Sequence, residues 1–279
     1  MLPVVSARRY VQPLREGGSL PALVDTESGL FVTKFRGAGQ GAKALIAEVI
    51  VGGLAQHLGL PVPELAVVHL DEGFGRAEPD PEIQDILRGS IGANVGLRFV
   101  PGAFAYDPTV HADLVLPDLA ADIVWLDALT TNIDRTARNP NLLIAPGEQD
   151  PKLWLIDHGA ALYFHHDWAN VDADRAQTPF PAIRDHVLLP RASSVADADD
   201  RLAHRLDDDT LSRILGSVPD ELLTAVPEGR TPDFETADDA RDAYRFVLRQ
   251  RLASPRRWVD AASNAQDEPP DTSALSYRR

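Results

Sequence analysis

The chain has 279 residues, 44% of them hydrophobic, which is enough for a buried core in one large domain or in two small ones. The formal net charge of -15 comes from 42 acidic and 27 basic residues and argues against direct nucleic-acid binding, because an acidic surface repels phosphate. The absence of cysteine excludes disulfides, cysteine-ligated zinc and a cysteine nucleophile.

No targeting or membrane segment is evident in the sequence. The first ten residues lack the charged start, apolar centre and small-residue cleavage site of a secretory signal peptide. No apolar run reaches the roughly 18 residues that a membrane-spanning helix needs. We therefore expect a cytoplasmic protein without a membrane span.

The first hundred residues read as short strands around one helix. Alternating apolar residues and turn residues predict strands over 9–14, 21–25, 29–35, 64–70 and 94–100, and we expect the first three to form a small antiparallel sheet. Apolar residues at helical spacing predict a helix of about four turns over 42–58, with Gly59 and Pro61 ending it. The polar piece before residue 94 is expected to be loop-like or partly helical.

From residue 101 the pattern becomes helical. Leucine and isoleucine recur at helical spacing from Leu116 to Leu129 and predict a helix that leads into a polar loop. At least one further helix is predicted within 206–223, and a capping box at Thr236 opens another. Residues 168–196 have loop composition, and residues 263–279 are expected to be a disordered tail.

Lys34 and Glu48 both place a charge in an apolar setting. Lys34 ends a predicted strand, and Glu48 lies inside an otherwise apolar helix, where an unpaired buried carboxylate would be costly. A strand lysine paired with a helix glutamate positions nucleotide phosphates in kinases. A surface lysine and a glutamate on a solvated helix face are the alternatives.

The polar loop after the helix carries the residues of a phosphoryl-transfer site. Asp134 can accept a proton from the nucleophile, and Asp157 ends a second apolar strand, where its carboxylate can hold a metal ion. Between them, Asn139 lies five residues after Asp134, whereas Asn141 directly enters an apolar strand. Either amide fits the second metal ligand, and we favour Asn141 slightly. Arg135 either neutralises an anion or faces solvent.

Two glycine-rich segments are candidates for phosphate contacts. The turn that contains Gly17, Gly18 and Ser19 resembles a plain hairpin turn as much as a phosphate loop. The segment 37–41 precedes a helix but fits neither the Walker A pattern nor the dinucleotide pattern. Phe99 and Val100, at the end of the predicted strand 94–100, are also assigned to the nucleotide site.

The order of these parts resembles the HipA-like kinase domain. The similar parts are the strand lysine, the helix glutamate, the loop Asn132–Arg135, the strand entered by Asn141, and the sequence Ile156–Gly159. The catalytic loop is more distantly similar to that of phosphatidylinositol kinases. The resemblance spans roughly residues 10–260 and is strongest from Asp134 to Gly159. The chain is shorter than HipA-type toxins and lacks their usual glycine-rich loop before the strand lysine.

The resemblance implies a two-lobed α+β protein-kinase-like fold that binds ATP and Mg²⁺. The expected parts are an N-terminal nucleotide-binding lobe over 1–100, a mostly helical catalytic lobe over 101–262, and the tail. The implied reaction is transfer of the γ-phosphoryl group to a hydroxyl, with serine or threonine of a protein as the acceptor. HipA-type toxins are restrained by a DNA-binding antitoxin, and nothing in this sequence supports such a partner. A small-molecule or lipid-type kinase and a pseudokinase without turnover are the alternatives.

Overall fold

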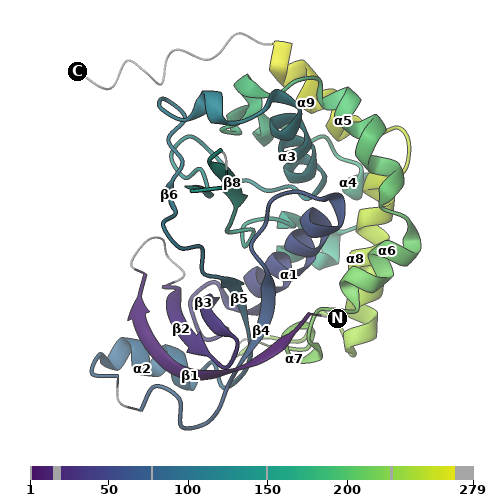
Figure 1. Ribbon diagram of the computed structural model, residues 1–279. Coiled ribbons are helices and arrows are strands. Elements are labelled where there is room, and N and C mark those ends of the chain that lie inside the picture. The colour runs from purple at the N-terminus through teal and green to yellow at the C-terminus, as the bar shows by residue number, and fades with distance from the viewer. Residues whose placement is uncertain (1, 15–19, 77, 149, 227–228, 268–279) are drawn as a thin grey trace, which may run out of the picture.

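A computed structural model describes residues 2–14, 20–76, 78–148, 150–226 and 229–267. The candidate phosphate turn with Gly17, Gly18 and Ser19 lies outside these residues. The described chain is a mixed α+β structure, with a small β-barrel at one end and most of the helices at the other (Figure 1). Among the described residues, no helix is long and apolar enough to cross a membrane.

Five strands form a closed barrel in the order β1-β2-β3-β5-β4. Their bounds are Val4–Pro13 for β1, Ala22–Thr26 for β2, Gly29–Lys34 for β3, Leu65–Leu70 for β4 and Gly92–Arg98 for β5. The first three strands pair antiparallel, as expected. They do not form a separate open sheet, however, because β1 also pairs with β4 in parallel, with Val4 opposite Val67, and this closes the barrel. Strand β1 begins before residue 9, and its first residues supply the pairing that closes the barrel.

The barrel has its own apolar core. It includes Val5, Val24, Phe31 and Val68, and Leu87 of α2 (Pro81–Arg88) packs with it. Gly96 allows two strands to come close, because a Cβ there would lie 2.7 Å from Val68 Cγ2 and 3.1 Å from Phe31 Cβ. The barrel interior is thus filled by side chains rather than open.

Helix α1 (Gly41–Leu58) lies between the barrel and the helical part of the molecule (Figure 1). Its apolar residues surround the helix axis instead of forming one stripe, as expected for a helix covered on all sides. Gly59 ends it in the left-handed conformation, at φ 80°, and satisfies the last carbonyls. The burial of α1 forces Glu48, on its third turn, to find a partner inside the protein.

The helical part is built around α3 (Pro117–Leu129), whose residues from Ile123 to Leu129 are all buried. The larger helices packed around it are α5 (Val195–Leu202), α8 (Ala237–Leu252) and α9 (Arg257–Asp267), with α6 (Asp208–Leu215) and α7 (Asp220–Leu223) beside α1. A small antiparallel sheet adjoins them, made of β6 (Phe104–Ala105), β7 (Leu142–Ala145) and β8 (Lys152–Leu155). Helix α3 leads into the polar loop, β7 follows the loop directly, and β8 leads to Asp157.

Several sequence predictions are confirmed and others need correction. The capping box at Thr236 is present, with Asp239 as its partner. The segment expected as a loop instead contains short helices: η3 (Trp168–Asn170), α4 (Ala173–Ala176), η4 (Pro181–Asp185), η5 (Leu189–Arg191) and the start of α5. Helix α9 continues past residue 262 to Asp267, because Trp258 and Ala262 bury one of its faces. The other short helices are η1 (Ala112–Leu114), η2 (Tyr163–His166) and η6 (Ala203–Arg205).

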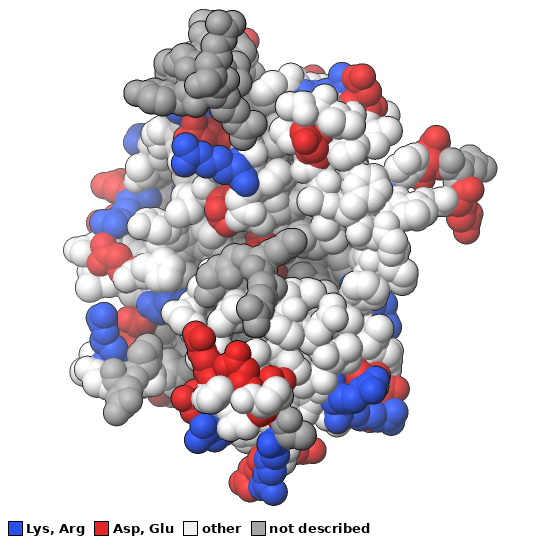
Figure 2. All heavy atoms as spheres, turned by 90° about the vertical axis from the view of Figure 1, so that its left-hand side faces the viewer, with Lys and Arg blue, Asp and Glu red and all other residues white. Residues whose placement is uncertain are grey.

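The surface agrees with the acidic composition. On the face shown in Figure 2, the described basic side chains lie scattered among acidic ones. Charges of both signs are thus mixed on that face.

Candidate active site

Lys34 joins the barrel to the helical part of the protein. It is the last residue of β3 and is 7% exposed. Its ammonium contacts the carboxylate of Glu48 on α1 and that of Asp157, which follows β8. One cation therefore connects the neighbouring elements β3 and α1 with Asp157, which lies 123 residues after Lys34, and the alternative of a surface lysine is excluded.

Lys34, Glu48 and Asp157 form a charged triad, and its surroundings shift the pKa of each member. Burial alone would lower the pKa of Lys34, but the carboxylates of Glu48 and Asp157 outweigh it and raise that pKa. Complete burial raises the pKa of Glu48 against the opposing effect of Lys34. Burial also opposes ionisation of Asp157, yet the nearby ammonium of Lys34 lowers its pKa. The triad thus keeps Lys34 charged and Asp157 ionised near neutral pH.

Asp157 stands where the chain turns sharply. Its backbone is left-handed, at φ 54°, and the Gly159 N–H lies 3.4 Å from Asp157 Oδ1. A Cβ at Gly159 would lie 3.4 Å from Ala44 Cβ and 3.5 Å from Lys34 Nζ. The backbone at Gly159 therefore runs directly beside the lysine ammonium and the first turn of α1.

Asp134 is the acceptor for both candidate amides. Asn139 Nδ2 lies 2.7 Å and Asn141 Nδ2 3.2 Å from the same Asp134 oxygen, Oδ2. The backbone N–H of Asp134 donates to Asn132 Oδ1 at 3.1 Å. No hydrogen bond from either amide to Asp157 is found in the described structure. Asn141 is buried and left-handed, at φ 50°, whereas Asn139 is exposed.

The other residues assigned to the nucleotide site lie just outside regular structure. Phe99 follows β5, is 36% exposed, and donates its N–H to Leu30 O at 2.9 Å; Val100 comes next. In the 37–41 loop, Gly37 is packed tightly, because a Cβ there would lie 2.6 Å from Ile86 O. Gly39 and Gly41 face open space, and Gly41 has φ 64°. This loop leads from Lys34 into α1. Its open side, at Gly39 and Gly41, therefore lies at the end of the barrel that carries Lys34.

Comparison with known proteins identifies the family. The family model described as HipA-like kinase matches residues 10–240. The chain belongs to the HipA-like kinase family. A crystal structure of the Helicobacter pylori proinflammatory kinase CtkA is similar, with a TM-score of 0.51, 13% sequence identity, and coverage of 99% of this chain and 100% of that one. That likeness concerns the fold. A comparison with curated proteins finds no match.

Membership in the HipA-like kinase family makes the chain a phosphotransferase. The carboxylate of Asp157 and the amide oxygen of Asn141 or Asn139 are ligand types that fit a magnesium ion, which is bound through few protein groups and leaves several positions to phosphate and water. In the part of the chain that the structure describes, no three His, Cys, Asp or Glu side chains cluster as a metal site.

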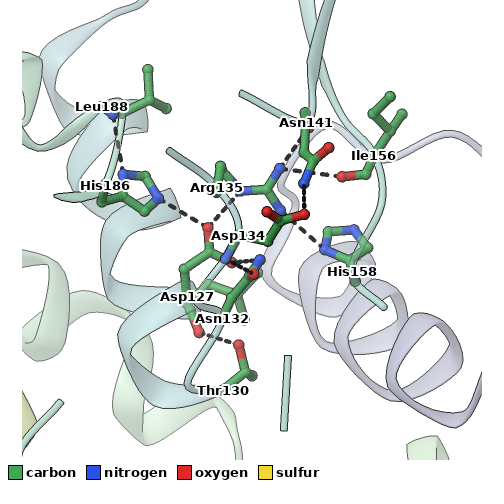
Figure 3. A network of polar contacts seen from close by, with 11 residues as sticks. Asp127, Thr130, Asn132, Asp134, Arg135, Asn141, Ile156, His158, His186 and Leu188 are labelled. Atoms are coloured by element: carbon green, nitrogen blue, oxygen red, sulfur yellow. Dashed lines mark hydrogen bonds and ion pairs between the residues drawn. The ribbon is translucent and has the colours of Figure 1, made fainter. Parts of the chain in front are cut away.

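A buried ionic network that the sequence did not reveal lies next to these HipA-like kinase residues (Figure 3). Arg135, left open between two roles, is 1% exposed and pairs with Asp127 of α3. His186, after η4, contacts the same carboxylate at 2.9 Å. Asp127 carried the same signal as Glu48, a carboxylate within an apolar helix. No sequence signal pointed to His186, which lies 59 residues later.

The network contains two neutral histidines. Complete burial, reinforced by Arg135, lowers the pKa of His158 to about 3. Burial also lowers the pKa of His186, although Asp127 opposes the shift. Burial raises the pKa of Asp127, but the charge of Arg135 and the hydrogen bond from His186 lower it far more. Asp127 is therefore the buried anion that balances Arg135.

Proposed function

We propose that this HipA-like kinase transfers the γ-phosphoryl group of ATP to a hydroxyl in a Mg²⁺-dependent reaction. The observation that supports this most is the contact of Lys34 with both Glu48 and Asp157. A lysine held by a helix glutamate beside a metal-binding carboxylate is the arrangement that aligns ATP phosphates in kinases. Family membership supports the reaction class.

We further propose the two-lobed layout that the family suggests. Residues 1–100, with the barrel and α1, would form the nucleotide-binding lobe, and residues 101–262 would form the catalytic lobe. The supporting feature is that Lys34 and Glu48 come from the first part and Asp157 from the second. Phe99 and Val100, at the connection, are then placed to contact the nucleotide.

The proposed roles follow from the chemistry of each side chain. The acceptor hydroxyl oxygen forms a bond to the γ-phosphorus, the bond from that phosphorus to the β–γ bridging oxygen breaks, and ADP leaves. Asp134 takes the hydroxyl proton, and Asn139 and Asn141 orient its carboxylate. Lys34 holds the phosphates by charge, while Glu48 holds Lys34. Asp157 with Asn141 or Asn139 would hold Mg²⁺, which neutralises charge on the phosphate oxygens when bound.

We propose a serine or threonine of a protein as the acceptor, on the strength of the resemblance to HipA-type kinases. The direct test is incubation of the purified protein with Mg²⁺ and ATP, followed by mass spectrometry for phosphorylated hydroxyls. ADP release is measured in parallel for the wild type and for Asp157→Ala. We expect ADP release that the variant loses. ATP binding without any ADP release, under every acceptor tried, would instead show a pseudokinase, whereas ADP release without protein phosphorylation would indicate a small-molecule acceptor.

A further inference from the structure

The guanidinium of Arg135 links the two backbone segments that carry the proposed metal ligands (Figure 3). Its Nη1 donates to the Asn141 carbonyl at 2.5 Å and to the Ile156 carbonyl at 3.2 Å. Its Nη2 lies 3.2 Å from His158 Nδ1. The backbone N–H of Ile156 also donates to the Asn141 carbonyl, at 3.0 Å. Asn141 and Asp157 are thus tied together through backbone groups rather than through their own side chains.

Both of these residues have left-handed backbones. Asn141 has φ 50° and Asp157 has φ 54°, in a region that few L-residues other than Asn and Asp enter. In residues other than glycine such conformations need support from the surroundings. The Ile156 carbonyl belongs to the peptide unit that enters Asp157, and the Asn141 carbonyl to the unit that leaves Asn141. By holding these two carbonyls, Arg135 sets the direction in which both side chains leave the backbone.

Asp127 and His186 fix the position of the Arg135 side chain. Arg135 Nε lies 2.5 Å from Asp127 Oδ2, and both side chains are 0% exposed. The backbone N–H of Leu188 donates to His186 Nδ1 at 3.1 Å, so the ring proton is on Nε2 and is donated to Asp127. The backbone N–H of Val187 donates to the Arg135 carbonyl at 3.0 Å. The segment after η4 therefore supports the arginine through its side chain and its backbone.

We propose that Arg135 is a positioning residue that holds Asn141 and Asp157 in the geometry required for binding Mg²⁺, with Asp127 and His186 holding Arg135 in turn. This rests on the proposed function, since it takes Asn141 and Asp157 as the metal ligands. Arg135 touches neither substrate nor metal in this role. It acts as an outer-shell group, whose loss in metal sites typically costs about 10–100-fold in metal affinity or activity.

The test compares Arg135→Lys with Arg251→Lys. Lysine at 135 keeps a charge beside Asp127 but lacks the planar fork that reaches two segments at once. Arg251 is a matched control, because it is also buried and donates to the Leu129, Ala128 and Ala176 carbonyls, away from the proposed ligands. The readout is the Mg²⁺ concentration that gives half of the thermal stabilisation produced with a non-hydrolysable ATP analogue, together with kcat and the KM for ATP.

We expect Arg135→Lys to raise the Mg²⁺ midpoint by about 10-fold or more and to lower kcat, with little change in metal-free binding of the analogue. Arg251→Lys should lose stability without moving the Mg²⁺ midpoint. Equal midpoints in the two folded variants would overturn the proposal. If Arg135→Lys does not fold, His186→Asn decides: a raised Mg²⁺ midpoint supports the proposal and an unchanged one overturns it. A wild type that shows no response to Mg²⁺ or to the analogue would refute the kinase function itself.

Discussion

The carboxylate of Glu48 contacts the ammonium of Lys34, with only 1% and 9% of the two side chains exposed. Asp157, which follows β8 in the part of the chain after the barrel, contacts the same ammonium. Lys34 is therefore shared between a carboxylate that stays buried and one that is proposed to turn to the metal ion. If Asp157 turns to the metal ion as proposed, the contact with Glu48 is the one that keeps Lys34 in place to meet ATP.

Replacing Glu48 by Gln tests this relationship. We expect kcat/KM for ATP to fall by about 100-fold, because the neutral amide holds Lys34 less firmly and Asp157 then competes for it. The measurement is the initial rate as a function of ATP concentration. Glu64→Gln is the control, since Glu64 pairs with Arg98 at 2.6 Å on the surface, where ion pairs contribute little. A similar loss in both variants would contradict the special role of Glu48.

Asp134→Asn separates chemistry from binding. The amide cannot accept the hydroxyl proton, so we expect kcat to fall by about 10²–10⁴-fold while ATP binding is unchanged. Calorimetric titration with the non-hydrolysable analogue measures the binding, and ADP release measures the rate. Asp113→Asn, at a side chain that is 98% exposed, should behave like the wild type. Full activity in Asp134→Asn would remove Asp134 from the proposed mechanism.

The ambiguity between Asn139 and Asn141 can be resolved with glycine variants. Glycine accepts φ 50° without strain, so Asn141→Gly removes the amide and keeps the backbone. We expect Asn141→Gly to raise the Mg²⁺ concentration needed for half-maximal activity by at least about 10-fold. Asn139→Gly should affect kcat more than the Mg²⁺ requirement, because the exposed amide donates to Asp134 at 2.7 Å. The reverse order of effects would assign the metal to Asn139.

The sequence predicted those site residues that a short stretch of the chain is enough to identify. Glu48 stood out because a carboxylate within an apolar helix needs a partner, and a strand lysine lay 14 residues before it. Asp157 stood out because an apolar strand ended on it. The closure of the barrel could not be predicted, because Val4 and Val67 pair across more than sixty residues. An alternating apolar pattern predicts a strand but does not show which other strand pairs with it. Arg135 was equally unreadable, since its contacts with Asp127, Asn141 and Ile156 depend on three separate segments meeting.

Gly96→Ala tests the packing inside the barrel. A Cβ would lie 2.7 Å from Val68 Cγ2 and 3.1 Å from Phe31 Cβ, so both neighbours must move in a filled core. We expect the free energy of unfolding to fall by about 1–3 kcal/mol, as measured by urea denaturation. Gly73→Ala is the matched control, because nothing lies within 4 Å of a Cβ there. Equal stability of the two variants would mean that the barrel core is less tightly packed than the structure shows.

The buried histidines predict that stability falls as the pH falls. Burial lowers the pKa of His165, with His166 and Lys43 adding to the shift, and lowers the pKa of His158 to about 3. Below pH 6.5 the unfolded chain therefore binds protons that the folded chain does not, which favours unfolding. Each such histidine should cost roughly 1 kcal/mol per pH unit below 6.5 until the pH reaches its folded pKa.

The measurement is the free energy of unfolding between pH 7.5 and pH 5.5. His165→Gln loses the contact with Tyr244, so its stability at pH 7.5 is expected to drop, but its dependence on pH should become shallower. His204→Gln, at an exposed position, is the control substitution. The quantity to compare is the slope of the free energy of unfolding against pH, because lost packing lowers that free energy equally at every pH. An unchanged slope in His165→Gln would show that this histidine takes up a proton while the chain remains folded.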